Sequence, residues 1–355
     1  MAKIVLDHIG HSYADAAENE TDWALQDVNL TWSDGGAYAL LGPSGCGKTT
    51  LLNIISGLLN PTKGRILFGD RDVTDLPSEK REIAQVFQFP VVYDTMTVFD
   101  NLAFPLRNRG MAEDSVKKRV IEIAAMLDLE SSLNNRAAGL TADGKQKISL
   151  GRGLVRSEIN AILFDEPLTV IDPHLKWQLR SKLKILHRSL ETTMIYVTHD
   201  QTEALTFADK VVVVHDGKVV QVGTPVELFD TPKHTFVGHF IGSPGMNVLP
   251  ASIREGRAYF KNFRIPNQKT VEAAEGAAKL EFGVRPEFVR FSAEGIPVQV
   301  VKVNDVGRYR IVDVSIEEHI LKIVVSDDMP IPESKACITF EEGKGHLYAD
   351  GWLVS

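Results

Sequence analysis

Residues 37–58 read AYALLGPSGCGKTTLLNIISGL, and this stretch decides the fold of the N-terminal part of the chain. It begins as an apolar run typical of a buried strand and passes through a glycine-rich loop. It then continues with leucine and isoleucine at helical spacing. The loop fits the pattern G-x-x-x-x-G-K-[ST], in which glycines let backbone N–H groups converge on phosphate. The stretch therefore predicts a nucleotide-binding loop between a strand and a helix.

The predicted phosphate loop consists of Gly42, Pro43, Ser44, Gly45, Cys46, Gly47, Lys48, Thr49 and Thr50. We expect Lys48 to reach the terminal phosphates and the Thr49 hydroxyl to be a ligand of Mg²⁺. Such a pattern arises by chance in roughly one chain of this length per hundred at average residue frequencies. The flanking strand and helix make a chance match rarer still.

Composition bounds the remaining possibilities. A length of 355 residues suits two domains, and 44% hydrophobic with 24% charged residues is typical of a soluble, core-forming protein. The net charge of −8 argues against a nucleic-acid-binding surface. Cys46 and Cys337 are far apart, so no disulfide framework is indicated and a reducing cytosol fits. The sequence shows no signal peptide and no apolar window of about 18 residues, so we expect no membrane span but allow binding to a membrane partner.

Polar residues follow two further strand-like runs. Asp165 and Glu166 end AILFDEP at 161–167, where one carboxylate suits the shell of Mg²⁺ and the second can polarise an attacking water. Without the phosphate loop, a solvated acidic turn would explain them equally well. His199 ends TMIYVTHD and is a candidate for contacting a γ-phosphate, although a histidine at a strand end is often structural. Gln88 in VFQFP is, taken alone, more readily a loop amide than a ligand.

The rest of the chain indicates two kinds of architecture. Strand-like runs cover 3–13 and 24–32, residues 111–135 read as a helical insert with a polar face, and 210–225 reads as a hairpin turning at Asp216–Gly217. Around residue 242 helical patterns nearly vanish. Short strands are then expected at 257–263, 279–286, 296–303, 309–316, 319–325, 335–340 and 346–354, which suggests a small barrel or sandwich. The register of the run at 309–316 stays open.

Taken in order, five motifs resemble those of the ABC-transporter ATPase family. They are a Walker A loop at 42–50, a Q-loop at 86–106, a Walker B strand at 161–167, a D-loop at 168–172 and an H-loop at 197–205. GSPGMNVLP at 242–250 and FGVRPEFVRF at 282–291 resemble the C-terminal OB-type regulatory domain of sugar, polyol and glycerol-phosphate importers. The resemblance implies an α/β P-loop ATPase core over 1–240, with a RecA-like sheet and a helical subdomain at about 90–155. An all-β OB-type domain is implied over 241–355.

The same resemblance implies roles for individual residues. Tyr13 would stack on adenine, unless it is an ordinary strand tyrosine. Thr49, Asp165 and Gln88 would surround Mg²⁺ directly or through water. The remaining implied roles are general base for Glu166, γ-phosphate switch for His199 and contact with the opposite subunit for Asp172.

The family signature, normally Leu-Ser-Gly-Gly-Gln at a helix start, reads Leu140, Thr141, Ala142, Asp143 and Gly144 in this chain. Residues 145–154 are predicted to be helical. In the family, each signature closes over the ATP held by the opposite subunit. A carboxylate about 5 Å from a phosphate charge costs on the order of 3 kcal/mol at an effective dielectric of about 20. We expect Asp143 to impair hydrolysis of the ATP held by the opposite subunit. The alternative is a tolerated variant with full activity, for which Lys145 is the expected compensating charge.

The altered signature would serve the ATP of the opposite subunit, whereas the chain's own Walker A loop, Walker B strand, Gln88 and His199 fit the family pattern. This asymmetry fits a heterodimer with a second ATPase whose signature is complete, because a homodimer would carry two weakened sites. The expected function is therefore the ATP-hydrolysing subunit of an importer for a carbohydrate, a polyol such as glycerol, or glycerol phosphate. Implied partners are integral membrane permease subunits and, indirectly, an external solute-binding protein, with the chain peripheral on the cytoplasmic face of the inner membrane. Permease docking is expected at the apolar residues after Gln88, namely Phe89, Val91, Val92 and Tyr93.

Two alternatives remain. A soluble ABC ATPase of translation or DNA repair usually carries two cassettes or a long coiled-coil insertion, and the sequence has neither. An ATP-sensing regulatory subunit would not need both Glu166 and His199. The transported solute is left open, because the resemblance places specificity in other subunits.

Overall fold

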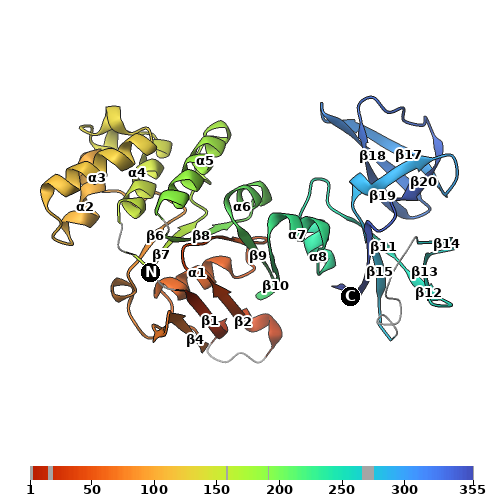
Figure 1. Cartoon of the computed structure of the whole chain (residues 1–355), viewed down its shortest axis with the longest axis horizontal. Coiled ribbons are helices and arrows are strands. Elements are labelled where there is room, and N and C mark those ends of the chain that lie inside the picture. The colour runs from red at the N-terminus through yellow and green to blue at the C-terminus, as the bar shows by residue number, and fades with distance from the viewer. Residues whose placement is uncertain (1–2, 15–18, 157–158, 191, 266–275, 355) are drawn as a thin grey trace. The chain divides into compact units, whose positions relative to one another are not determined.

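The computed structural model describes residues 3–14, 19–156, 159–190, 192–265 and 276–354. Contacts divide the chain into two compact units, Met1–Thr224 and Pro225–Ser355 (Figure 1). The sequence placed a boundary near 240, within the second of these units. The reason for the earlier division is that α7 (Pro225–Asp230) and α8 (Thr235–Phe240) pack with strands that follow them, and α8 contacts β11 (Asn247–Pro250).

A six-stranded sheet forms the centre of the first unit. Its order is β10-β9-β3-β8-β7-β6, with β3 at Ala37–Leu41, β6 at Ile83–Val86, β7 at Ala161–Asp165, β8 at Thr193–Thr198, β9 at Lys210–His215 and β10 at Lys218–Gly223. All neighbouring pairs are parallel except β9 and β10. Every residue of β3, β7 and β8 is buried, as expected for parallel strands covered on both faces. The carboxyl ends of these three strands therefore meet at one edge of the sheet.

A second, antiparallel sheet of four strands has the order β2-β1-β4-β5. Its strands are β1 (Ile4–Ser12), β2 (Trp23–Trp32), β4 (Lys63–Phe68) and β5 (Arg71–Asp72). The inward faces of β1 and β2 share a hydrophobic core with α1 (Lys48–Ser56) and the central sheet. Leu51, Leu52, Ile54 and Ile55 of α1 are fully buried in this core, which fixes the helix that follows the phosphate loop.

Three helices, α2 (Val98–Arg107), α3 (Glu113–Met126) and α4 (Ala142–Leu154), gather in a separate helical lobe (yellow in Figure 1). The prediction that α4 begins at Lys145 was wrong by one turn. The Thr141 side chain caps the helix by accepting a hydrogen bond from the N–H of Gly144 at 3.2 Å. This cap extends the helix to Ala142, since an N-cap hydroxyl satisfies an otherwise unpaired N–H of the first turn.

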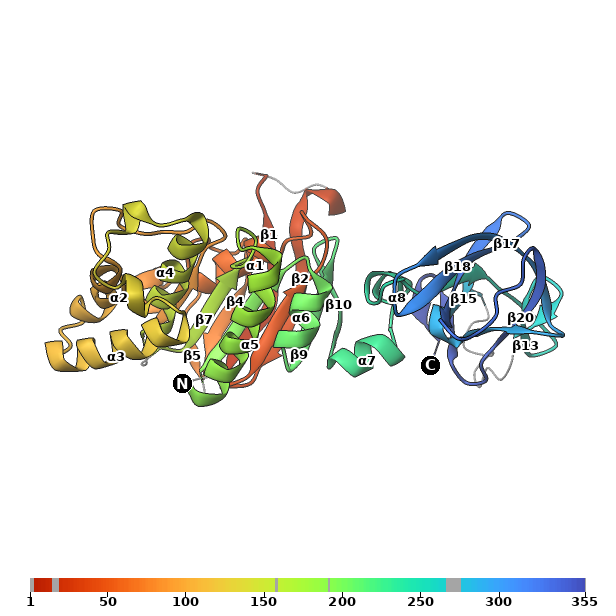
Figure 2. The ribbon, with the colours of Figure 1, turned by 90° about the horizontal axis from the view of Figure 1, so that it is seen from above.

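Two helices, α5 (Pro173–Leu190) and α6 (Gln201–Phe207), lie side by side in the same unit (Figure 2). No helix among the described residues is long and apolar enough to cross a bilayer. The predicted hairpin of β9 and β10 is confirmed. Asp216 and Gly217 have φ of 47° and 72°, the positive values that a two-residue type I′ turn requires.

The second unit is rich in strands after α8. One sheet has the order β11-β15-β21-β22, with β15 at Leu280–Val284, β21 at Gly345–Ala349 and β22 at Trp352–Leu353. A small sheet joins β12 (Ser252–Arg254), β13 (Arg257–Phe260) and β14 (Phe263–Arg264). A third has the order β16-β20-β17-β18-β19, with β16 at Val289–Ser292, β17 at Ile296–Asp305, β18 at Tyr309–Ile316, β19 at His319–Ser326 and β20 at Lys335–Phe340.

The open register of β18 is settled by burial. Val312, Val314 and Ile316 alternate along the strand and are buried in the core of this unit. Ile311 lies on the other face and is only half-buried. Short 3₁₀ helices among the described residues span Glu20–Asp22, Ser78–Lys80, Glu130–Ser132, Ala137–Gly139 and Pro286–Phe288. The expected fold class, an α/β core followed by an all-β part, is confirmed.

Candidate nucleotide-hydrolysis site

The phosphate loop joins the carboxyl end of β3 to the N-terminus of α1. Gly45 and Gly47 have φ of 81° and 99°, a left-handed conformation that side chains rarely adopt. A Cβ atom on Gly47 would lie 2.4 Å from the carbonyl oxygen of Ala24, and one on Gly42 would lie 2.2 Å from that of Val214. The loop can therefore follow this path only with glycine at these positions.

Lys48 is the first residue of α1 and is 5% exposed. Its ammonium donates hydrogen bonds to the carbonyl oxygens of Gly42 at 2.9 Å and Pro43 at 2.8 Å. The charge is thus held inside the curve of the loop, at the positive end of a helix. A phosphate placed there meets both the ammonium and the helix N-terminus.

A hydroxyl and a carboxylate meet beside this loop. The Thr49 hydroxyl donates a hydrogen bond to Oδ1 of Asp165 at 3.1 Å, which joins α1 to the end of β7. Burial raises the pKa of Asp165, while the Thr49 hydrogen bond partly opposes that rise. These two oxygen donors suit Mg²⁺, which prefers carboxylate and hydroxyl ligands. Gln88 is half-buried on the bend that follows β6, the strand next to β7 in the sheet.

Glu166 lies directly after β7 in a strained backbone conformation. Its φ is 45°, and its N–H donates to the carbonyl oxygen of Val197 on β8 at 3.0 Å. Non-glycine residues at positive φ cluster at functional sites, because the surrounding structure must enforce the conformation. This geometry directs the carboxylate toward His199, whose Nδ1 lies 3.0 Å from Oε1 of Glu166.

Tyr13 follows β1 and has a largely exposed side chain, with 68% of its surface accessible. Its hydroxyl lies 3.0 Å from the hydroxyl of Thr50, and its ring packs against that of His11 in a T-shaped pair with the ring centroids 4.7 Å apart. An aromatic face is therefore available to solvent next to the phosphate loop. The structure thus brings Tyr13 together with the predicted loop residues, although they are far apart in sequence.

The sequence did not predict the buried carboxylate of Glu203, which contacts β8, the strand that ends just before His199. Glu203 on α6 is 4% exposed and accepts hydrogen bonds from the hydroxyls of Tyr196 and Thr198 on β8, each at 3.0 Å. Lys176 of α5 lies 3.7 Å from its other oxygen. The spacing Asp200-x-x-Glu203 is typical of a capping box, which would place the glutamate at the helix N-terminus. That pattern gave no sign that the side chain turns inward and ties β8, α5 and α6 together.

The altered signature occupies the first turn of α4. The Oδ2 atom of Asp143 lies 3.8 Å from Nζ of Lys147, while Oδ1 is buried and has no hydrogen-bond partner among the described residues. Lys145 instead forms an ion pair with Asp94 at 2.8 Å. Lys147, and not Lys145, therefore supplies the charge that faces Asp143. Asp172 is exposed at the start of α5, where its Oδ1 accepts a hydrogen bond from the N–H of His174 at 2.9 Å.

The segment after Gln88 borders a groove of the first unit. Phe89, Val91 and Tyr93 are exposed, and Val92 is half-buried. Arg152 of α4 donates to the carbonyl oxygen of Val91 at 2.8 Å and stacks over the ring of Tyr93 at 4.7 Å. A cavity of about 190 Å³ lies beside Val91 and Arg152. We call the residues Phe89, Val91, Val92 and Tyr93 the docking segment.

Comparison with known proteins identifies the architecture. The ABC transporter family profile matches residues 25–169, and the MalK OB fold domain profile matches residues 242–289. The chain is 42% identical to the sn-glycerol-3-phosphate import ATP-binding protein UgpC of Brucella abortus biovar 1 (strain 9-941), over 83% of this chain and 80% of that protein. It is 37% identical to the uncharacterized ABC transporter ATP-binding protein y4oS of Sinorhizobium fredii (strain NBRC 101917 / NGR234), over 94% of both proteins.

Solved structures agree with this result. The ATP-binding cassette MJ0796, in a dimeric post-hydrolysis state bound to ADP and Pi, matches 62% of this chain and 98% of its own, with a TM-score of 0.56 and 28% identity. The cbiO1 protein from Clostridium perfringens, part of the ABC transporter complex cbiONQ, matches 64% of this chain and 90% of its own, with a TM-score of 0.58 and 26% identity. With these likenesses and the phosphate loop in place, the chain belongs to the family of ABC-transporter import ATP-binding proteins, which are ATPases.

Proposed function

We propose that this chain hydrolyses Mg²⁺-bound ATP to drive an importer of a phosphorylated polyol such as glycerol phosphate. The observation that carries the proposal is the meeting of Glu166, His199 and the Lys48 loop at the carboxyl ends of adjacent strands. The relative from Brucella abortus, named for sn-glycerol-3-phosphate import, supports the solute class. A carbohydrate or an uncharged polyol is the alternative solute.

Binding of ATP would use three parts of the site. Tyr13 offers its exposed ring to the adenine base, and the loop from Gly42 to Thr50 surrounds the phosphates with N–H donors. Lys48 would exchange its two carbonyl partners for the terminal phosphates. Thr49, Asp165 and Gln88 would hold Mg²⁺, which when bound neutralises part of the phosphate charge.

Hydrolysis would depend on Glu166. Its carboxylate orients the attacking water and accepts a proton from it, while His199 holds the carboxylate and reaches the γ-phosphate. The strained backbone at Glu166 fixes the carboxylate before substrate arrives, so little reorientation is needed at the moment of reaction.

Coupling to transport would use the docking segment. Exposed apolar side chains beside a groove suit a short helix of an integral membrane permease subunit. The chain would then lie peripherally on the cytoplasmic face of the membrane and act indirectly with an external solute-binding protein. We propose that residues 1–240 form the ATPase domain of the sequence and residues 241–355 the OB-type domain. The compact units of the structure divide earlier, after Thr224.

The signature favours a heterodimer with a second ATPase. Thr141, Ala142, Asp143 and Gly144 would face the ATP held by that partner. Thr141 keeps the hydroxyl of the family's serine, whereas Ala142 and Asp143 carry side chains where the family has two glycines. The chain's own loop, Glu166 and His199 carry no such change, so its own ATP would be the one hydrolysed when the partner's signature is complete.

The decisive experiment is ATP turnover of the membrane complex in proteoliposomes, with solute and binding protein added. We expect turnover to rise with glycerol 3-phosphate and to require Glu166. Turnover that responds to glycerol or a sugar but not to glycerol 3-phosphate would contradict the phosphorylated-polyol assignment.

A further inference from the structure

A fully buried amide on α4 contacts two backbone segments of the hydrolysis site. Gln146 is 0% exposed, and its Nε2 donates to the carbonyl oxygen of Pro167 at 2.7 Å and to that of Phe87 at 3.3 Å. Pro167 directly follows Glu166, and Phe87 directly precedes Gln88. One side chain therefore joins the segment of the proposed base to the segment of a proposed Mg²⁺ ligand.

Two donor bonds fix the orientation of the Gln146 amide. A glutamine NH₂ group has two hydrogens, so the two carbonyl oxygens use its donor capacity completely. Its Oε1 atom is buried and has no hydrogen-bond partner among the described residues. Turned the other way, the amide would place this oxygen against the two carbonyl oxygens, so only one orientation is favourable. The side chain is therefore a fixed donor.

The bond to Pro167 holds a short turn that begins at Glu166. The N–H and the hydroxyl of Thr169 both donate to the carbonyl oxygen of Glu166, at 3.2 and 3.0 Å. From β8, the carbonyl oxygen of Val197 accepts the N–H of Glu166 at 3.0 Å. The left-handed φ of 45° at Glu166 persists because such neighbours enforce it. Gln146 supplies one of these restraints, directly beside the strained residue.

Hydrophobic side chains hold α4 in place independently of this amide. Ile148, Leu150 and Leu154 of α4 are 0% exposed, and the helix packs against α2 and β6. Burial of apolar surface of this kind is the main stabilising contribution to helix packing. An apolar side chain of similar length at Gln146 should therefore leave the helix in place while removing the two donor bonds.

We propose that Gln146 is a positioning residue for hydrolysis, which holds the Glu166–Thr169 turn so that the carboxylate faces the attacking water. The inference rests on the proposed role of Glu166 as the base and adds the residue that sets its position. The hydrogen bonds of Gln146 end on Pro167 and Phe87 and not on the phosphate loop. Its loss should therefore lower turnover and leave nucleotide affinity nearly unchanged.

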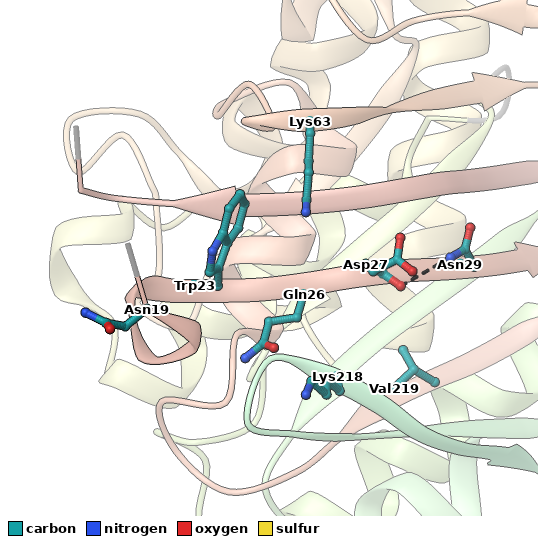
Figure 3. A pocket seen from close by; sticks show the side chains of 8 residues that line it. All are labelled: Asn19, Trp23, Gln26, Asp27, Asn29, Lys63, Lys218 and Val219. Atoms are coloured by element: carbon teal, nitrogen blue, oxygen red, sulfur yellow. Dashed lines mark hydrogen bonds between the residues drawn. The ribbon is translucent and has the colours of Figure 1, made fainter. Parts of the chain in front are cut away.

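The test compares Gln146→Met with Gln26→Met in the purified complex. Each substitution removes an amide that donates to a backbone carbonyl oxygen, which for Gln26 is that of Asp216 at 3.3 Å. Gln26 lines a cavity of about 700 Å³ beside β2, where none of the lining residues belongs to the hydrolysis site (Figure 3). We expect Gln146→Met to lower kcat by about tenfold to a hundredfold with KM for ATP changed less than about twofold, and Gln26→Met to change neither.

Two further variants separate positioning from a loss of stability. Val120→Ala opens a cavity in the core of α3, so it should lower Tm while keeping kcat within about twofold. In a Glu166→Gln chain, Gln146→Met should lower the residual single-turnover rate by less than about twofold, because the carboxylate that it positions is gone.

Hydrogen exchange of the isolated chain reports on the turn without requiring turnover. The N–H groups of Glu166 and Thr169 should exchange faster in Gln146→Met than in Gln26→Met or Val120→Ala. An unchanged kcat, or an equal loss with and without the Glu166 carboxylate, overturns the inference. A parent complex that hydrolyses no ATP overturns the proposed function instead, and equal exchange in all three variants would then still overturn the role of Gln146.

Discussion

The carboxylate of Glu166 lies 3.0 Å from Nδ1 of His199, although the two residues are 33 positions apart in the chain. Parallel pairing of β7 with β8 brings them together, because each residue follows the carboxyl end of its strand. The contact places a proton acceptor and an imidazole on the same side of the phosphate loop. The hydrolysis chemistry proposed for the chain depends on this pair.

Glu166→Gln should leave ATP binding intact and lower turnover by about a thousandfold or more, because the amide cannot accept the proton of the attacking water. Steady-state hydrolysis by the purified complex is the measurement. Lys48→Ala is the matched comparison, since it should weaken nucleotide binding itself. Equal turnover in Glu166→Gln and the parent chain would remove Glu166 from the role of base.

Glu203→Ala should destabilise the first unit by about 2–4 kcal/mol, because two buried hydroxyls and Lys176 lose their acceptor. Glu203→Gln should lose less, since the amide retains one oxygen acceptor. Thermal unfolding of both variants is the measurement, with the exposed Glu79→Gln as the control. A Glu203→Ala chain as stable as the control would show that the buried network contributes nothing.

Changing Ala142 and Asp143 together to glycine should raise turnover of the complex by about tenfold, provided that the partner ATPase has its own catalytic residues. The gain is expected to stay below the full cost of placing a carboxylate beside phosphate, because Lys147 already offsets part of the Asp143 charge. Lys147→Met should accordingly lower the turnover of the parent complex. An isolated chain that forms a homodimer and hydrolyses ATP as fast as the complex would contradict the asymmetric arrangement.

Val92→Asp or Tyr93→Glu should release the chain from membranes that contain the permease subunits, because a charge would enter the apolar contact. Sedimentation with those membranes is the measurement, and nucleotide binding by the isolated variant should persist. Val301→Asp provides the control, since Val301 is an exposed valine of the second unit. Retention of the docking-segment variants on the membrane would place the docking site elsewhere.

A chain that ends at residue 224 should be monodisperse and bind ATP, whereas one that ends at 245 should aggregate. In the longer chain Leu228, Val237 and Ile241, each fully buried in the second unit, would lose their cover. The guanidinium of Arg285 would also be missing, although it donates five hydrogen bonds to the carbonyl oxygens of Leu228, Phe229, Gly238 and Ile241. Size-exclusion chromatography distinguishes the two chains, and equal behaviour would contradict the division at Thr224.

The sequence predicted those features whose structure is determined by a few neighbouring residues. The phosphate loop, the buried strands and the Asp216–Gly217 hairpin follow from residue types over a few positions, and the fold class is confirmed. Contacts between distant segments left no such pattern. The inward turn of Glu203, the pairing of Lys145 with Asp94 and the attachment of α7 and α8 to Arg285 all depend on tertiary packing.

The left-handed backbone at Glu166 has a consequence for evolution under a stability threshold. An L-residue with a Cβ atom is disfavoured there by about 1 kcal/mol relative to glycine, so Glu166→Gly should make the folded chain more stable while removing the carboxylate. Selection for robustness alone would replace this residue. On the proposed role of Glu166 as the base, this position exchanges thermal stability for activity, and random screens for stabilised variants should repeatedly recover inactive glycine variants here.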